Sequence, residues 1–176
     1  SLATLPGVPS DVARPGYDIA AIGIGIVHLG LGAFHRAHQA VYTDAILPRH
    51  PDWGICGVGV MPADQRMKDA LTAQDGLYTL IVENPDGRRD VRVIGSIVDY
   101  LYAPDDPEAV IALLAAPTTR MVSLTITEGG YHNVDQAGEH SVFGLVTAAL
   151  QRRRDHGVNS PTIVSCDNIE GNGDVA

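Results

Sequence analysis

The sequence predicts an α/β fold, in which a doubly wound, mainly parallel sheet carries one inserted β-hairpin. Short apolar runs alternate with segments of helical periodicity along most of the chain, which is the order expected when parallel strands are joined by right-handed crossover helices. Two further runs rich in Val, Ile and Tyr flank the turn sequence Asn84-Pro85-Asp86-Gly87, which is typical of a hairpin.

Each element follows from its local pattern. Residues 1–24 are expected to form an extended lead-in, because the first 18 residues contain three prolines and no hydrophobic period. Residues 25–176 are expected to form a single domain. We expect strands at 26–31, 55–60, 120–126 and 162–165, helices at 34–45, 65–74, 105–115 and 139–155, and the two strands of the hairpin at 77–83 and 90–100.

Composition narrows the class of protein. The 176 residues are 45% hydrophobic and include 19 Gly and 11 Pro, which suits one globular domain with many tight connections. No apolar run approaches the length of a membrane span and the first residues do not resemble a signal peptide, so we expect no membrane partner and a cytoplasmic location. The net charge of −9 disfavours nucleic acid as a partner but leaves room for an anionic small molecule bound by main-chain N–H groups.

The two cysteines give no sign of a disulfide framework or a zinc site. Cys56 and Cys166 lie in separate short apolar runs, so both are expected to be buried, inert thiols. His35 and His38 share a helical face, but no carboxylate or cysteine accompanies them at ligand spacing. The sequence therefore predicts no metal.

The turn after the first strand carries the main functional signal. Gly30-Leu31-Gly32-Ala33-Phe34-His35 begins like the dinucleotide fingerprint: the first glycine makes a sharp turn, the second lets the main chain approach a pyrophosphate, and the helix that follows directs its positive end at the phosphates. His35 departs from the small third residue of that fingerprint. The alternative is a tight strand-to-helix turn with no ligand. We predict that Gly30, Gly32, Ala33 and Phe34 bind the cofactor.

Two charged residues near this turn have two interpretations each. Asp64 follows the second strand, where it would bind the ribose hydroxyls or act as the N-cap of the next helix. Arg36 would contact the pyrophosphate or remain a solvated cation. Since residues 61–64 contain no Arg or Lys, NAD is favoured over NADP, although Arg66 keeps NADP open.

Polar residues also follow the two later strands. Thr127 and Glu128 come after the strand at 120–126, and Asn168 and Asn172 come after the strand at 162–165. The carboxyl ends of parallel strands share one edge of a sheet, so these residues are expected to line the cofactor pocket. The amide of Asn168 or Asn172 would stabilise an alkoxide oxygen, or the asparagines serve only the conformation of the turn.

The segments 26–39, 74–80, 127–131 and 165–168 together resemble the polyol-specific long-chain dehydrogenases. The stretch Gly32-Ala33-Phe34-His35-Arg36-Ala37-His38 is the most specific of them, because His35 replaces the usual small residue. The resemblance covers nearly the whole chain after the lead-in. It implies a Rossmann-type domain of a metal-independent, NAD-dependent enzyme.

The resemblance also implies the reaction and what this chain lacks. The reaction is the interconversion of a polyol and a ketose by hydride transfer at C2, as between mannitol and fructose, or fructuronate or tagaturonate reduction in the same family. Asn168 is carried over as the residue that stabilises the oxyanion. The general-base Lys, with an Asn and a His, belongs to a C-terminal helical domain that is not in this chain, so the 176 residues alone are expected to be inactive. A stand-alone nucleotide-sensing module and a flavin enzyme of the same fold are the competing hypotheses.

Overall fold

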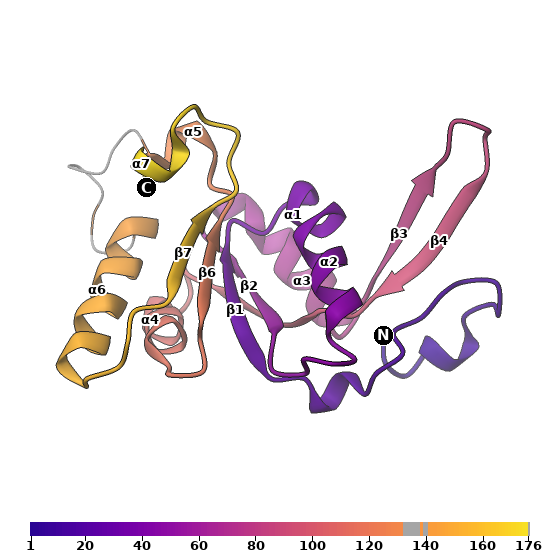
Figure 1. Cartoon of the computed structure of the whole chain (residues 1–176), viewed down its shortest axis with the longest axis horizontal. Coiled ribbons are helices and arrows are strands. Elements are labelled where there is room, and N and C mark those ends of the chain that lie inside the picture. Colours follow the sequence, from indigo (N-terminus) through magenta and orange to yellow (C-terminus); the bar gives the residue numbers. More distant parts are fainter. Residues whose placement is uncertain (132–137, 139–140, 176) are drawn as a thin grey trace.

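The computed structural model describes residues 1–131, 138 and 141–175, and its centre is a sheet of five parallel strands in the order β5-β2-β1-β6-β7 (Figure 1). From the central β1 the chain builds outward on one side through β2 and β5, then crosses back to β6 and β7. Because the direction of winding reverses between β1 and β6, a crevice opens there at the carboxyl ends of the strands. The strands are β1 (Ile24–Leu29), β2 (Gly54–Gly59), β5 (Ile97–Tyr102), β6 (Met121–Leu124) and β7 (Thr162–Ser165).

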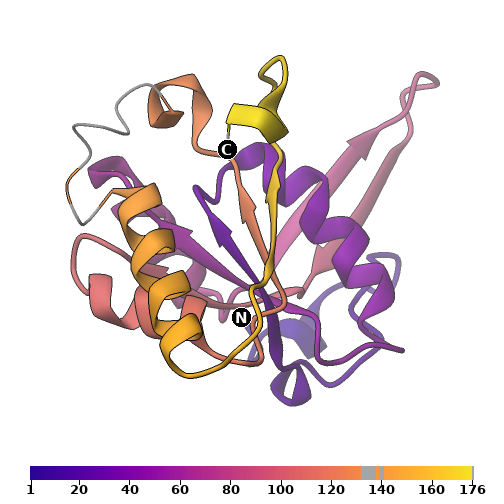
Figure 2. The ribbon, with the colours of Figure 1, turned by 60° about the vertical axis from the view of Figure 1, so that its left-hand side comes forward.

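Helices cover both faces of this sheet (Figure 2). On one face α2 (Gln39–Ile46) and α3 (Gln65–Ala73) bury Ala40 and Leu71 against Ile26. On the other face α4 (Pro107–Ala115) and α6 (Val142–Asp155) pack against Val27 and its neighbours. Successive residues of β1 therefore serve opposite cores, as the pleat of a strand requires. The prediction of a doubly wound parallel sheet is confirmed.

Five further short helices lie in the described part of the chain. Three lie in the lead-in and at the carboxyl edge of β2, and two follow β6 and β7. The segment 1–24 is thus less extended than predicted, and β1 begins at its last residue. The short helices are η1 (Leu5–Gly7), η2 (Ile19–Ala21), η3 (Pro62–Asp64), α5 (Thr127–Tyr131) and α7 (Asn172–Val175).

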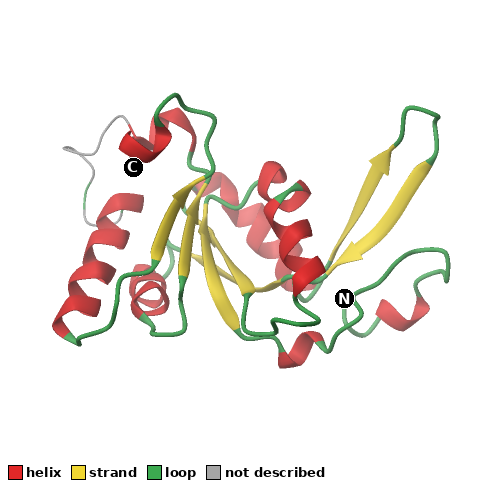
Figure 3. Ribbon diagram, viewed as in Figure 1, coloured by secondary structure: helices red, strands yellow, loops and turns green. Residues whose placement is uncertain are grey.

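The hairpin is confirmed, but its second strand is shorter than predicted. β3 (Tyr78–Glu83) and β4 (Arg89–Ile94) pair antiparallel and project away from the main sheet (Figure 3). The expected strand at 90–100 ends at Ile94, and its last part returns to the sheet as β5. The break is fixed by long-range hydrogen bonds: Gly95 N donates to Asp44 Oδ1 at 2.9 Å, and Ser96 Oγ donates to the carbonyl of Ala40 at 2.7 Å.

The first predicted helix, at 34–45, is broken in two. α1 (Ala33–Ala37) ends at His38, whose φ and ψ of −126° and −87° are not helical, and α2 starts at the next residue. The predicted helix at 139–155 begins at Val142, with Ser141 Oγ accepting from Gly144 N at 3.0 Å. Residues 139 and 140 lie outside the described part of the chain.

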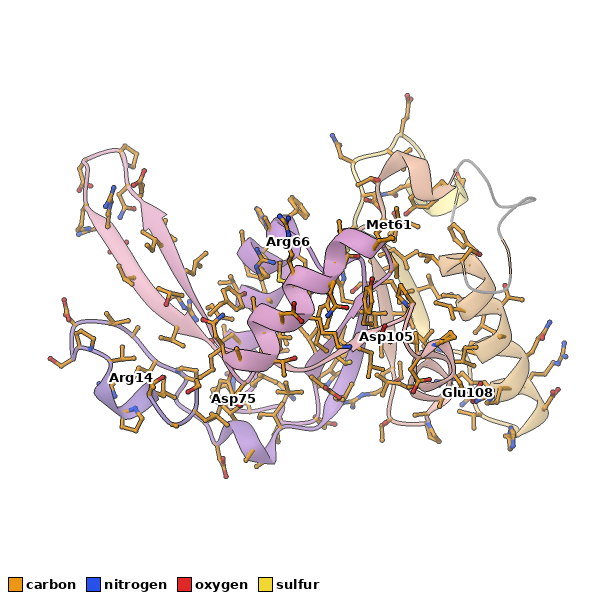
Figure 4. All side chains as sticks on the ribbon, turned by 180° about the vertical axis from the view of Figure 1, so that it is seen from behind. Arg14, Met61, Arg66, Asp75, Asp105 and Glu108 are labelled. Carbon is orange, nitrogen blue, oxygen red and sulfur yellow. The ribbon has the colours of Figure 1, made fainter. Side chains whose placement is uncertain are left out.

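Arg153 fixes the layer formed by α4 and α6. Its side chain is buried, and it donates to the carbonyls of Leu114 at 2.9 Å, Ala116 at 2.8 Å and Asn159 at 2.7 Å. The first two acceptors lie at the C-terminus of α4, where the helix dipole favours a cation. The neighbouring Arg152 instead forms a surface ion pair with Glu108 of α4, at 2.6 Å (Figure 4).

Replacing Arg153 should destabilise the domain more than replacing its neighbour. Arg153→Met removes the donor from one buried and two partly buried hydrogen bonds to carbonyl groups, so we expect the free energy of unfolding to fall by about 2–4 kcal/mol. Arg154→Met is the control, since the side chain of Arg154 is 76% exposed, and it should change stability by less than about 0.5 kcal/mol. Urea unfolding measures both, and equal effects would contradict a structural role for Arg153.

Candidate functional site

A cleft of about 680 Å³ lies at the carboxyl edge of the sheet, over the turns that follow β1, β6 and β7. It occupies the point at which the winding of the sheet reverses. Six of the ten residues predicted from the sequence as site residues line it: Gly30, Gly32, Ala33, Phe34, Thr127 and Asn168. The other residues that line the cleft are Thr125, Cys166, Asp167, Ile169 and Glu170.

The two glycines of the first turn meet different constraints. Gly30 has a φ of +84°, and a Cβ there would overlap the carbonyl oxygen of Thr125, so the fold itself requires glycine. Gly32 has an ordinary φ of −111°, and the atom nearest to a Cβ would be the Gly30 oxygen at 3.9 Å. The fold does not require glycine at position 32, which borders the open cleft.

His35, at the third position of the fingerprint, packs on another histidine. It is 1% exposed and its ring stacks on that of His28 of β1, with centroids 3.7 Å apart and planes 26° from parallel. Neither ring nitrogen of His35 has a hydrogen-bond partner among the described residues. Burial, together with the nearby Arg36, lowers the pKa of His35 from 6.5 to about 4, and burial also places the pKa of His28 well below its usual value. At neutral pH the stack is therefore uncharged.

Asp167 connects the two later turns, a role that the sequence analysis missed. Its Oδ2 accepts from Ile126 N at 3.0 Å and from the Tyr131 hydroxyl at 2.9 Å, and its Oδ1 accepts from Thr127 N at 2.9 Å. Thr127 has a φ of +61°, which is unfavourable for a β-branched residue and persists only where its surroundings hold it. The only signal in the sequence was a carboxylate directly after a strand. The two main-chain N–H groups that donate to this carboxylate lie 41 and 40 residues away.

The two asparagines after β7 have different surroundings. Asn172 donates through Nδ2 to the carbonyl of Asp167 at 2.9 Å, as expected from the alternative interpretation in which it serves the conformation of the turn. Asn168 is exposed on the wall of the cleft. No hydrogen bond of its side chain to another described residue is found, which leaves its amide available to a ligand.

Asp64 and Arg36 lie outside the cleft. Asp64 Oδ2 accepts from the main-chain N–H groups of Val60 and Met61, both at 2.9 Å. Asp64 stands at the N-cap position of α3, as one interpretation expected, but its side chain makes no cap bond to that helix and secures the loop before the helix instead. Arg36 is half-buried and donates to Met67 Sδ at 2.9 Å, away from the residues that line the cleft. Figure 4 places Met61 and Arg66 near the same end of α3.

The predicted residues not yet placed are Glu128 and the two cysteines. The side chain of Glu128 lies outside the described part of the chain. Cys56 is buried as expected, but Cys166 is half-buried and lines the cleft, which corrects the prediction for that residue. Burial raises the pKa of both thiols.

Across 1–131, 138 and 141–175 no three His, Cys, Asp or Glu side chains gather as metal ligands would, and none of the helices there has the length and hydropathy to span a bilayer.

A five-stranded parallel sheet with a glycine turn at its switch point defines a dinucleotide-binding domain of the Rossmann type. Comparison with known proteins then gives the family. Residues 24–176 match the Rossmann domain of mannitol dehydrogenases, and the chain belongs to this family.

Relatives extend well beyond this domain. The polyol:NADP oxidoreductase of Gluconobacter oxydans is 46% identical over 98% of this chain, which spans 40% of that relative. The mannitol 2-dehydrogenase of Pyrenophora tritici-repentis is 45% identical over 94% of this chain, which spans 33% of that protein. Among solved structures, Pseudomonas fluorescens mannitol 2-dehydrogenase, in a ternary complex with NAD and D-mannitol, is 42% identical, with a TM-score of 0.90 over 98% of this chain and 39% of that one. The substrate-free D-sorbitol dehydrogenase is 44% identical, with a TM-score of 0.91 over 98% of this chain and 40% of that one.

The buried histidine stack should make stability depend on pH. Because the pKa of His35 is about 4 in the fold against 6.5 without it, the unfolded chain takes up a proton first as the pH falls. The contribution of His35 to the free energy of unfolding is thus complete above pH 6.5 and declines toward pH 4, by up to about 3 kcal/mol.

Urea unfolding at several pH values tests this effect. His35→Leu should flatten the decline between pH 6.5 and 4, because the variant has no ring to protonate at this position. His38→Leu is the matched control, since His38 is exposed, and it should keep the slope of the wild type. A His35→Leu variant with an unchanged slope would show that the stack does not titrate as described.

Proposed function

We propose that this chain is the NAD-binding domain of a polyol dehydrogenase that interconverts a polyol and a ketose at C2, of the mannitol and fructose type. The observation that carries the proposal is the contrast between the two glycines. Gly30 is required by the fold, whereas Gly32 is not and faces an open cleft. The fold gives no reason for glycine at position 32, where the main chain borders a cavity. A glycine there fits the close approach of a pyrophosphate to the main chain.

The residues of the cleft suit a dinucleotide. The main chain from Gly30 to Phe34 would hold the pyrophosphate, and Thr127 with Glu128 would flank the rest of the cofactor from the turn after β6. When bound, NAD supplies a nicotinamide ring that accepts or returns a hydride. The relative from Pseudomonas fluorescens was solved with NAD and D-mannitol, which supports both the cofactor and the substrate class.

Asn168 is the residue proposed to act on the substrate. Its exposed amide, on the wall of the cleft, would donate a hydrogen bond to the oxygen on the reacting carbon and stabilise the negative charge that develops there. Asp167 would keep Asn168 in place, because its carboxylate is bound to the turn after β6.

The complete enzyme is proposed to contain a second domain. The relatives are two and a half to three times as long as this chain, which covers 33 to 40% of them. We propose that the additional C-terminal domain supplies the general-base Lys and most contacts to the polyol or ketose. The 176-residue chain is therefore expected to bind cofactor without oxidising a polyol.

The choice between NAD and NADP is proposed to depend on Asp64. One oxygen of its carboxylate accepts two main-chain N–H groups, and no described residue donates to the other, which suits it to a ribose hydroxyl. A 2′-phosphate would meet this negative charge. Arg66, which is exposed two residues later, provides the opposing attraction.

Cofactor binding can be tested with NADH fluorescence. The wild type should show saturable binding and no oxidation of D-mannitol. Gly32→Ala should raise the Kd for NADH by about tenfold or more, because a methyl group enters the space of the pyrophosphate, while Tm stays within a few degrees. Gly30→Ala is the contrasting variant, and it should lower stability by more than about 2 kcal/mol. No saturable signal from the folded wild type would refute the proposal.

Cofactor preference can be tested at Asp64. Asp64→Asn keeps one oxygen to accept from Val60 and Met61 but replaces the other by a donor NH₂ group. It should weaken NADH binding by about tenfold, improve the ratio of NADPH to NADH affinity, and leave Tm nearly unchanged. Arg66→Ala should weaken NADPH and leave NADH within about twofold. Equal loss of both cofactors in Asp64→Asn would rule out a role in this choice.

A further inference from the structure

Beneath the cofactor turn lies a chain of polar side chains, buried at its centre and half-buried at its two ends, to which the proposed function assigns no role. His28 of β1 is 0% exposed. Its Nδ1 lies 2.8 Å from Ser123 Oγ and its Nε2 lies 2.8 Å from Thr125 Oγ1. Ser123 Oγ in turn lies 3.0 Å from Oε1 of the Gln39 side chain. At the other end, Thr125 Oγ1 donates to the carbonyl of Gly30 at 2.8 Å.

The last acceptor sets the direction of the whole chain. A carbonyl oxygen can only accept, so the single hydroxyl proton of Thr125 goes to Gly30. Thr125 Oγ1 must then accept from His28, which places the ring proton on Nε2. His28 Nδ1 is left as an acceptor and takes the proton of Ser123. Burial holds the pKa of His28 well below its usual value. The ring therefore stays neutral, and the hydrogen-bond donors along the chain all point in one direction.

The orientation of the Gln39 amide follows from the single proton of Ser123. If that proton is donated to His28, it cannot also be donated to Gln39 Oε1, so the amide must be turned by 180° to present its NH₂ group to the hydroxyl oxygen. The donors then run in one direction, from Gln39 through Ser123, His28 and Thr125 to Gly30. Each buried hydrogen bond has one donor and one acceptor, and the low polarity of the surroundings strengthens it.

We infer that this buried chain is a positioning device for the cofactor turn, with His28 as its central residue. Thr125 holds Gly30 from two sides, because its hydroxyl donates to the Gly30 carbonyl and its own carbonyl blocks the space beside the Gly30 Cα. The chain thereby links the turn after β1 to β6 and to α2. The inference deepens the proposed function and rests on it, since its effect on a ligand requires that the turn bind a dinucleotide.

The test compares hydroxyl deletions with conservative replacements. Thr125→Val removes the hydroxyl at constant shape and should raise the Kd for NADH about fivefold or more, whereas Thr125→Ser keeps the hydroxyl and should stay within about twofold of the wild type. Ser123→Ala should weaken NADH binding in the same direction, because His28 Nδ1 loses its donor.

Ser96→Ala is the matched control for general destabilisation. Ser96 is also a buried serine, and its hydroxyl donates to the carbonyl of Ala40 at 2.7 Å, away from the turn. We expect it to lower Tm about as much as Ser123→Ala but to leave the Kd for NADH unchanged. Long-range proton–nitrogen NMR of the histidine rings in the wild type should show the proton of His28 on Nε2.

The outcomes separate this inference from the proposed function. If the wild type binds NADH but Thr125→Val and Thr125→Ser bind it equally well, or if Ser123→Ala and Ser96→Ala have the same Kd, the positioning role is wrong. A proton on Nδ1 of His28 would also overturn it. If the folded wild type binds no NADH, the proposed function fails and the positioning role fails with it, whereas the ring proton on Nε2 would still establish the direction of the buried chain.

Discussion

The geometry of the site depends on the left-handed backbone conformation of Gly30. β1 is the central strand of the sheet, and the chain must turn sharply where it ends so that α1 can begin four residues later. The turn cannot relax toward other conformations, because Gly30 N donates to the carbonyl of Val58 at 2.9 Å and Thr125 encloses it from the other side. Neighbouring strands thus hold the turn in place. If the turn binds a pyrophosphate, as proposed, the main-chain donors are already positioned before the ligand arrives.

His35 explains how this turn departs from the usual fingerprint without losing its geometry. In the ordinary motif a small third residue lets the helix lie close to the strand. Here an imidazole fills that position and stacks on His28, the residue of β1 below it. Two aromatic rings at 3.7 Å form a flat, tight contact that replaces the close approach of backbones. The chain therefore keeps a packed junction of helix and strand, with the polarity of His28 directed to the neighbouring β6.

Local patterns predicted the sheet well because buried parallel strands are short apolar runs between helices, as at 26–31 and 55–60. They failed where distant contacts decide. The break after Ile94 depends on Asp44 and Ala40 of α2, which no local pattern reveals. Most of the cleft residues were found, since strand order brings the turns together. The role of Asp167 was missed because its hydrogen bonds join two turns far apart in the sequence.

The chemistry of the cleft indicates what the rest of the enzyme must add. Oxidation of an alcohol needs a group that takes the hydroxyl proton. Among the described residues that line the cleft, three side chains are ionisable. Asp167 uses both oxygens to accept main-chain N–H groups, and burial and the neighbouring Asp167 raise the pKa of the Cys166 thiol, which keeps it protonated. Glu170 is exposed, and a solvated carboxylate is a weak base toward an alcohol. In the proposed function this cleft holds the dinucleotide and stabilises the oxyanion, and the proton acceptor is expected from the part of the longer relatives that this chain does not span.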